Sequence, residues 1–178
     1  MDVRFVDASG AHSRQSDDVV VLLEREDGFV WVDVPVWDDE VDGFLWVDVP
    51  AWDSDAEAFL ERLGCHPLVV DACRQRNHVP TVHSYPDHYF VTVHAPLLGR
   101  AGHVHLLELD QIVGTNFLVT VHGPLNPVVD PNEALLETRA VLQRIEAGRF
   151  SPTTPAELSY AVTSAVVRRQ RGLVGDVA

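Results

Sequence analysis

Two groups of side chains in this 178-residue chain could bind a metal ion. His103 and His105 occupy alternate positions, and alternate residues of a strand share one face about 7 Å apart, so the pair could chelate zinc. Four carboxylates lie close together earlier in the chain, at Asp38, Asp39, Glu40 and Asp42. Carboxylate oxygens suit Mg²⁺, which nevertheless keeps several waters and seldom uses a full protein cage. Because two histidines do not complete a zinc site and acidic runs are commonly solvated loops, we expect at most a weakly bound Mg²⁺ or another divalent cation.

Three further histidines, His83, His94 and His122, each close a Thr-Val-His triplet. If their strands lie side by side, these rings would gather at one end of a sheet. The alternative is that each is a strand-end histidine bonded to backbone or solvent. The chain contains no Gly-x-Ser-x-Gly elbow, no phosphate-binding glycine loop and no His-Glu-x-x-His motif. The sequence therefore does not predict an enzyme.

The formal net charge of −14 is unevenly distributed along the chain. Residues 1–61 hold 17 of the 27 acidic side chains and only 3 of the 13 basic ones. Such an acidic segment repels nucleic acid and anionic lipid and attracts cations, so we expect no nucleic-acid partner. The simpler interpretation is a solvated acidic edge that keeps the protein in solution.

Length and composition predict one globular domain over residues 1–178, since 46% hydrophobic residues is ordinary for a folded domain of this size. Cys65 and Cys73 make no Cys-x-x-Cys motif and no disulfide framework, which favours buried thiols in a reducing cytosol. No signal peptide is recognisable, and no segment approaches the ~20 apolar residues of a membrane helix. We therefore expect a cytoplasmic domain that makes no membrane contact of its own.

A tandem repeat occupies residues 27–53. Residues 27–38 recur as residues 42–53, with differences only at Val30/Leu45 and Val36/Ala51. Each copy alternates as a strand does, and the second copy runs directly into a helix signal. We expect the second copy to fill the strand position of the fold, and the first to form an extra edge strand or a hairpin with it. Residues 16–26 are ambiguous between helix and strand, and a helix is the preferred interpretation.

The remaining elements follow from caps, glycines and changes of period. A Ser54-Asp55-Ala56-Glu57 capping box and Gly64 bound one helix. Proline at the first helical position starts three more, at 67–74, 131–147 and 155–171. Strands are expected at Val3–Val6, Val79–Ser84, His88–Ala95, Val104–Val113 and Asn116–His122, the last two antiparallel across Gly114-Thr115. This order predicts an α/β fold, a mixed sheet sandwiched between helices (α/β/α).

Four motifs occur in a fixed order between Gly64 and His122. They are Gly64-Cys65-His66-Pro67-Leu68, Val79-Pro80-Thr81-Val82, Tyr85-Pro86-Asp87-His88-Tyr89-Phe90 and Asn116-Phe117-Leu118-Val119-Thr120-Val121-His122. This set resembles the cytoplasmic N-terminal domain of the CorA family of divalent-cation transporters. The resemblance implies an α/β/α domain at the cytoplasmic face of the cell membrane that self-associates as a pentamer.

The same resemblance implies transport of Mg²⁺ and Co²⁺, or Zn²⁺, with cytosolic cations bound between protomers to hold the pore closed. The family's two membrane helices and Gly-Met-Asn signature are not in this sequence, whose only methionine is Met1. We therefore expect either an excised soluble domain, whose helices 131–171 lead toward a stalk, or a stand-alone relative. The competing hypothesis is a metal-sensing or protein-interaction domain built on the same fold.

Overall fold

The structure is a computed structural model, and it describes residues 1–14, 43–124 and 126–177. Within these residues, seven strands form one sheet in the order β2-β1-β3-β7-β6-β5-β4. They are β1 (Asp2–Asp7), β2 (Gly10–Arg14), β3 (Gly43–Val49), β4 (Thr81–Ser84), β5 (His88–Leu98), β6 (Val104–Gly114) and β7 (Phe117–His122). Only β3 and β7 pair in parallel among the described strands, so the sheet is mixed, as predicted.

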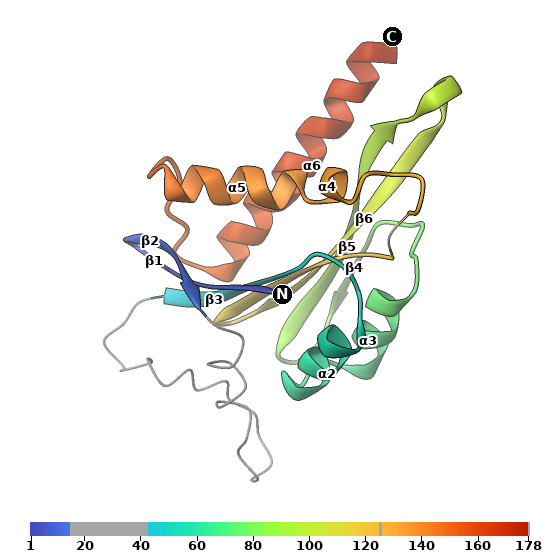
Figure 1. Cartoon of the computed structure of the whole chain (residues 1–178). Coiled ribbons are helices and arrows are strands. Elements are labelled where there is room, and N and C mark those ends of the chain that lie inside the picture. The colour runs from blue at the N-terminus through green and yellow to red at the C-terminus, as the bar shows by residue number, and fades with distance from the viewer. Residues whose placement is uncertain (15–42, 125, 178) are drawn as a thin grey trace.

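Helices cover both faces of this sheet. Figure 1 shows α2 and α3 packed on one face, while α5 and α6 cross the other. The helices are α2 (Ser54–Arg62), α3 (Pro67–Arg74), α4 (Pro131–Ala134), α5 (Leu136–Glu146) and α6 (Pro155–Val177), with a 3₁₀ turn, η1, at Arg100–Gly102. The predicted α/β/α arrangement is therefore confirmed. Of the helices described, none combines the length and apolar character needed to cross a membrane.

Two hydrophobic cores lie on opposite faces of the sheet. Val47 and Val119 of the central strands point toward α2 and α3, where they pack with Leu60. Their sequence neighbours Trp46 and Leu118 point the other way and pack with residues of α5 and α6. Because both faces of β3 and β7 are buried, these strands read as nearly continuous apolar runs.

The second copy of the repeat fills the sheet position predicted for it. It contributes β3, which pairs with β1 on one side and β7 on the other and leads into α2. The first copy of the repeat, and the helix expected over 16–26, lie outside the described residues, so both stay predictions.

Three local features differ from the sequence-based expectations. The hairpin partner β2 was not predicted, because its residues are mostly small or polar and show no apolar alternation. The N-cap of α2 is Asp53 and not Ser54, since its extended backbone lets the carboxylate accept from the Ala56 amide at 2.8 Å. The helix expected over 131–147 is two helices, because Leu135 leaves helical geometry between α4 and α5.

Candidate functional site

The residues predicted to bind a metal are not brought together in the described part of the chain. The carboxylates Asp38, Asp39, Glu40 and Asp42 lie outside it, so their role stays a prediction. His103 is exposed just after η1, whereas His105 lies on β6, where the Asn126 amide approaches its Nδ1 at 3.4 Å. Among the described residues, no group of three or more His, Cys, Asp or Glu side chains could hold a metal ion.

The three Thr-Val-His histidines are separated, so of the two interpretations of these triplets the gathering at one sheet end does not occur. β6 lies between β5 and β7, so His94 and His122 are not on neighbouring strands. His94 points toward the α2–α3 face, whereas His122 points toward α5 on the opposite face. His83 is exposed on the edge strand β4, paired with Phe90. Strand order and side-chain parity therefore keep the rings apart.

A pair of buried carboxyl groups occupies the middle of β6. Glu108 and Asp110 are 6% and 0% exposed, and alternate strand positions place them on the same face, beneath α3. Each carboxyl influences the pKa of the other, so the two groups are neighbours. Thr92 of the neighbouring strand β5 donates its hydroxyl to Asp110 Oδ1 at 2.7 Å. We call these residues the Glu108–Asp110 pair.

Asn77, just beyond α3, links the Glu108–Asp110 pair to the helix. Its backbone N–H donates to Glu108 Oε2 at 2.6 Å, and its side-chain amide lies 3.2 Å from Oε1 and 3.0 Å from the carbonyl of Ala72 in α3. Its own carbonyl accepts from Nε2 of His94 at 2.7 Å. One asparagine thus joins the end of α3 to both β5 and β6.

The surroundings of the Glu108–Asp110 pair favour the protonated form of one carboxyl. Burial, and then the neighbouring carboxylate of Glu108, raise the pKa of Asp110 to about 8, against hydrogen bonds from Thr92 and Cys73 that lower it. Burial also raises the pKa of Glu108, although the bonds from Asn77 oppose this. These surroundings therefore favour the protonated form of Asp110 at neutral pH.

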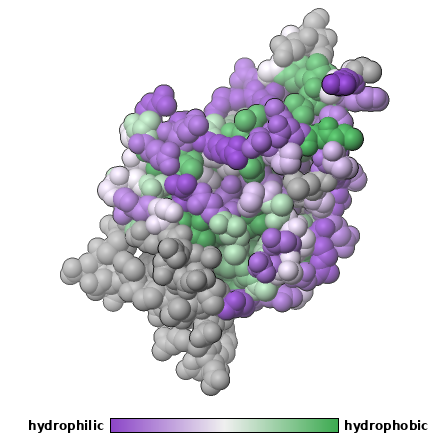
Figure 2. Space-filling model, in the orientation of Figure 1, coloured by the Kyte–Doolittle hydropathy of each residue, from purple (hydrophilic) through white to green (hydrophobic). Residues whose placement is uncertain are grey.

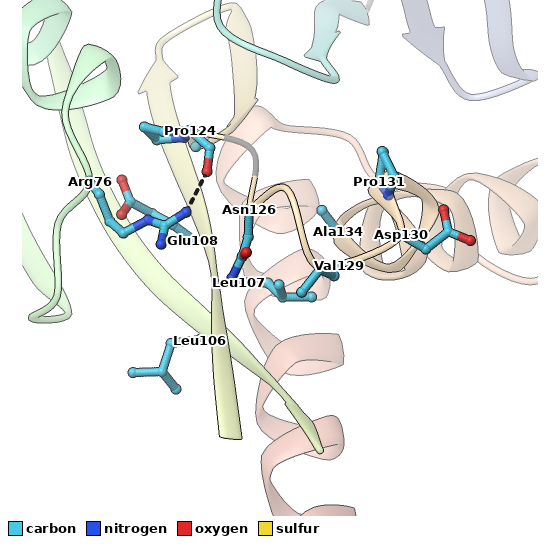
Figure 3. Close-up of a pocket in the computed structure, with 11 residues that line it drawn as sticks. Arg76, Leu106, Leu107, Glu108, Pro124, Asn126, Val129, Asp130, Pro131 and Ala134 are labelled. Carbon is cyan, nitrogen blue, oxygen red and sulfur yellow. Dashed lines mark hydrogen bonds between the residues drawn. The ribbon is translucent and has the colours of Figure 1, made fainter. Parts of the chain in front are cut away.

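A small cavity opens beside Glu108, and Figure 3 shows the residues that line it. Its volume of about 20 Å³ is enough for roughly one water molecule. Across the cavity Arg76 donates from Nη2 to the carbonyl of Pro124 at 2.9 Å, the contact drawn in Figure 3. A Cβ at Gly123 would lie 2.9 Å from Cβ of Glu108, so glycine lets this loop approach the pair.

A second polar network lies on the opposite face of the sheet, centred on Asp48 at the end of β3. Asp48 Oδ1 accepts from the Thr120 hydroxyl at 2.5 Å and from His122 Nε2 at 2.9 Å. Thr120 in turn accepts from the indole N–H of Trp46 at 3.1 Å, and Thr138 of α5 lies 3.4 Å from Asp48 Oδ2. The network therefore holds α5 against two parallel strands.

A larger cavity, of about 290 Å³, opens where Asp48 meets α5. Its polar lining is electrically balanced, because Asp2 and Asp48 face Arg4 and Arg139. Arg4 is already paired with Asp2 at 2.9 Å and with Glu146 at 3.3 Å. The same ring nitrogen of His122, Nε2, contacts both Asp48 and the Thr138 hydroxyl. A relay from acid to base to nucleophile needs the acid and the nucleophile on different ring nitrogens, so the three groups do not form one.

Sequence reasoning singled out His94 and His122 but missed the carboxyls at the centre of both networks, although one local signal was present. Glu108 and Asp110 stand at alternate positions of β6, on either side of Leu109 and among further apolar residues, which marks carboxyls on a buried face. The partners of these carboxyls were not visible, because Asn77 lies 31 residues away from Glu108 along the chain. Cys65 and Cys73 are buried free thiols, as the sequence predicted.

The fold and these sites define a class: an α/β domain with a mixed central sheet, in which buried polar networks attach helices to both faces. The chain belongs to the CorA-like Mg²⁺ transporter protein family, whose model matches residues 41–178. The match begins next to the second copy of the repeat, which fills the β3 position in this fold. No relative among curated proteins matches the chain.

Solved structures share the fold at low sequence identity. The full-length CmaX protein is similar with a TM-score of 0.68 and 14% identity, over 99% of this chain and 48% of that one. The soluble domain of CorA from Methanocaldococcus jannaschii gives 0.60 and 12% identity, over 98% and 59%. The complete CorA magnesium transporter from the same organism gives 0.62 and 14%, over 99% and 48%. The chain thus spans about half the length of these relatives.

Proposed function

We propose that this chain is the cytosolic regulatory domain of a CorA-like magnesium and cobalt ion transporter. In this role it faces the cytoplasm, self-associates as a pentamer, and binds divalent cations that hold a membrane pore closed. The observation that carries the proposal is the family match over residues 41–178. The similarity in fold to the soluble domain of an archaeal CorA supports it.

An exposed apolar stripe on α6 supports self-association. Tyr160, Val167 and Val174 are spaced seven residues apart, so they lie along one side of the helix, and they are 76%, 44% and 65% exposed. The opposite side of α6 carries Leu158 and Val162, which are buried against the sheet. Hydrophobic residues reach the surface in Figure 2 near the end of the molecule where α6 extends past the sheet. A second copy of the chain would cover this stripe.

The acidic character of the chain supports cation sensing. At a net charge of −14, copies of the chain repel one another, and a divalent cation bound between them relieves that repulsion. Binding that is tighter in the associated state shifts the population toward it, which is the physical basis of a cation-operated gate. The predicted carboxylates at 38–42 are candidates for such contacts.

Calorimetric titration of the chain with MgCl₂, CoCl₂ and ZnCl₂, with the mass followed by sedimentation equilibrium, tests this proposal. We expect heat of binding and a cation-dependent rise in mass, weakened by Val167→Glu on α6. The control is Val128→Glu, because Val128 is also an exposed valine, 76% against 44% for Val167, but lies in a loop. Absence of both heat and mass change contradicts cation sensing. Binding without self-association favours the competing stand-alone metal-sensing domain.

A further inference from the structure

We propose that the Glu108–Asp110 pair is a proton-binding site whose bound proton holds the end of α3 against the sheet. The proposal rests on side-chain geometry inside one chain and is independent of the transport role. The ligand of this site is the proton, and its binding is expected to change how firmly Asn77 attaches α3 to the sheet. No metal ion is needed for it.

The hydrogen-bond pattern shows where the proton resides. Asp110 Oδ1 accepts from Thr92, but Oδ2 is fully buried and has no hydrogen-bond partner among the described residues when it is treated as a bare carboxylate oxygen. A proton on Oδ2 resolves this, because the O–H can donate to the neighbouring carboxylate of Glu108. Glu108 then accepts from Asp110 and Asn77 together, and both buried acids are satisfied.

Among the described residues, the groups that face the pair offer no permanent positive charge as an alternative to the proton. β5 presents Thr92 and His94, and Nε2 of His94 lies 4.0 Å from Glu108 while donating to Asn77. α3 presents the thiol of Cys73, and β7 places apolar Val121 opposite Asp110. Arg76 lines the cavity next to Glu108 but donates to the carbonyl of Pro124. In the part of the chain that the structure describes, neither carboxyl has an arginine partner within salt-bridge distance.

Loss of the proton leaves two adjacent carboxylates in a buried site. The folded-state pKa of Asp110, about 8, lies above its ordinary value of 3.8, so the folded chain holds this proton more tightly than the unfolded chain does. The stabilisation is complete below the ordinary value and is lost as the pH rises through about 8. Repulsion then acts on Glu108, whose contacts with Asn77 hold the end of α3.

The linkage relation converts this into a measurable change. With a midpoint near 8, the protonated fraction of Asp110 falls about tenfold between pH 7 and pH 9, and the folding equilibrium constant falls by the same factor. Over the same interval we expect hydrogen exchange of the Asn77 amide and the last turn of α3, corrected for its intrinsic pH dependence, to accelerate by about tenfold.

Two measurements test the proposal. In a ¹³C NMR titration of the side-chain carboxyls of the wild-type chain, we expect one group of the pair to titrate near pH 8. The Asp110→Asn variant replaces the bound proton with an amide that can donate to Glu108 and accept from Thr92, so its α3 exchange should not change between pH 7 and 9. Glu61→Gln removes an exposed carboxylate of α2 and serves as the control that keeps the wild-type response.

Each outcome decides the proposal. If both carboxyls titrate below pH 6, no proton is held and the proposal is overturned, even where Asp110→Asn fails to fold. If one carboxyl titrates near pH 8 but α3 exchange stays constant, the proton does not hold the helix. If Asp110→Asn responds to pH as the wild type does, another group is responsible.

Discussion

Replacing Asp48 with alanine should destabilise the fold by about 3–5 kcal/mol. Asp48 accepts two short hydrogen bonds, from Thr120 at 2.5 Å and from His122 at 2.9 Å, and approaches Thr138 at 3.4 Å. A hydrogen bond to a charged group contributes about 1.5–3 kcal/mol, and a buried donor left without an acceptor costs about 1–3 kcal/mol. Because the Asp48 side chain is 21% exposed, we place the sum below the simple total of these values.

The position of His122 explains why this cost is not recovered by water. His122 is fully buried, and its Nδ1 already has no hydrogen-bond partner among the described residues. Removing Asp48 therefore leaves the second ring nitrogen with only the Thr138 hydroxyl, at 3.4 Å. Asp48→Asn keeps an oxygen acceptor for His122 and Thr120 and loses only the charge, so we expect it to cost about 1–2 kcal/mol.

Urea denaturation followed by circular dichroism measures these differences. The control is Asp55→Ala, an exposed carboxylate in the first turn of α2, which should cost at most about 0.3–1 kcal/mol through the helix dipole. An Asp48→Ala variant within about 1 kcal/mol of the wild type would refute the argument that Asp48 is the essential acceptor. Equal costs for the alanine and asparagine variants would show that the charge matters and not the hydrogen bonds.

Two further predictions concern the helices. Arg169→Met on α6 should lower the free energy of unfolding in urea by about 2–4 kcal/mol, because Arg169 pairs with the buried carboxylate of Glu137 at 3.2 Å. The control Arg168→Met, on the exposed side of α6, should cost under about 0.5 kcal/mol. Similar costs for both variants would contradict the pairing. Burial raises the pKa of the Cys65 thiol to about 12 and also raises that of Cys73. At pH 8 neither thiol should therefore react with a disulfide reagent until urea is added. Fast labelling of the native chain would show that the two thiols are not buried.

The elements predicted well from the sequence are those whose local pattern agrees with their tertiary environment. β6 and β7 show apolar residues on a strand period and a glycine turn between them, and the structure pairs them antiparallel, as expected. β2 was missed because it is stabilised by pairing with β1 and not by an apolar face. The break at Leu135 was also missed, because residues on both sides of it keep a helical spacing.

The site was harder to predict than the fold, because its members are distant in sequence and depend on strand order. The Thr-Val-His triplets suggested a cluster of histidines, but the insertion of β6 between β5 and β7 separates His94 from His122. Strand β6 instead contributes two carboxyl groups, Glu108 and Asp110. Their raised pKa values depend on burial beneath α3, and their link to that helix depends on Asn77. No local pattern encodes that burial. The metal role of Asp38, Asp39, Glu40 and Asp42 stays a prediction.

The two polar networks lie back to back at one level of the sheet. His122 pairs with Leu109 across β6 and β7, and Leu109 stands between Glu108 and Asp110. Since side chains alternate along a strand, His122 and Leu109 point toward α5 and α6 while the two carboxyls point toward α3. A displacement of β6 or β7 at this level therefore changes hydrogen bonds on both faces. The proposed proton of the Glu108–Asp110 pair would thus act on the same level of the sheet that holds α5 through Asp48 and His122, so β6 and β7 connect the two helical layers.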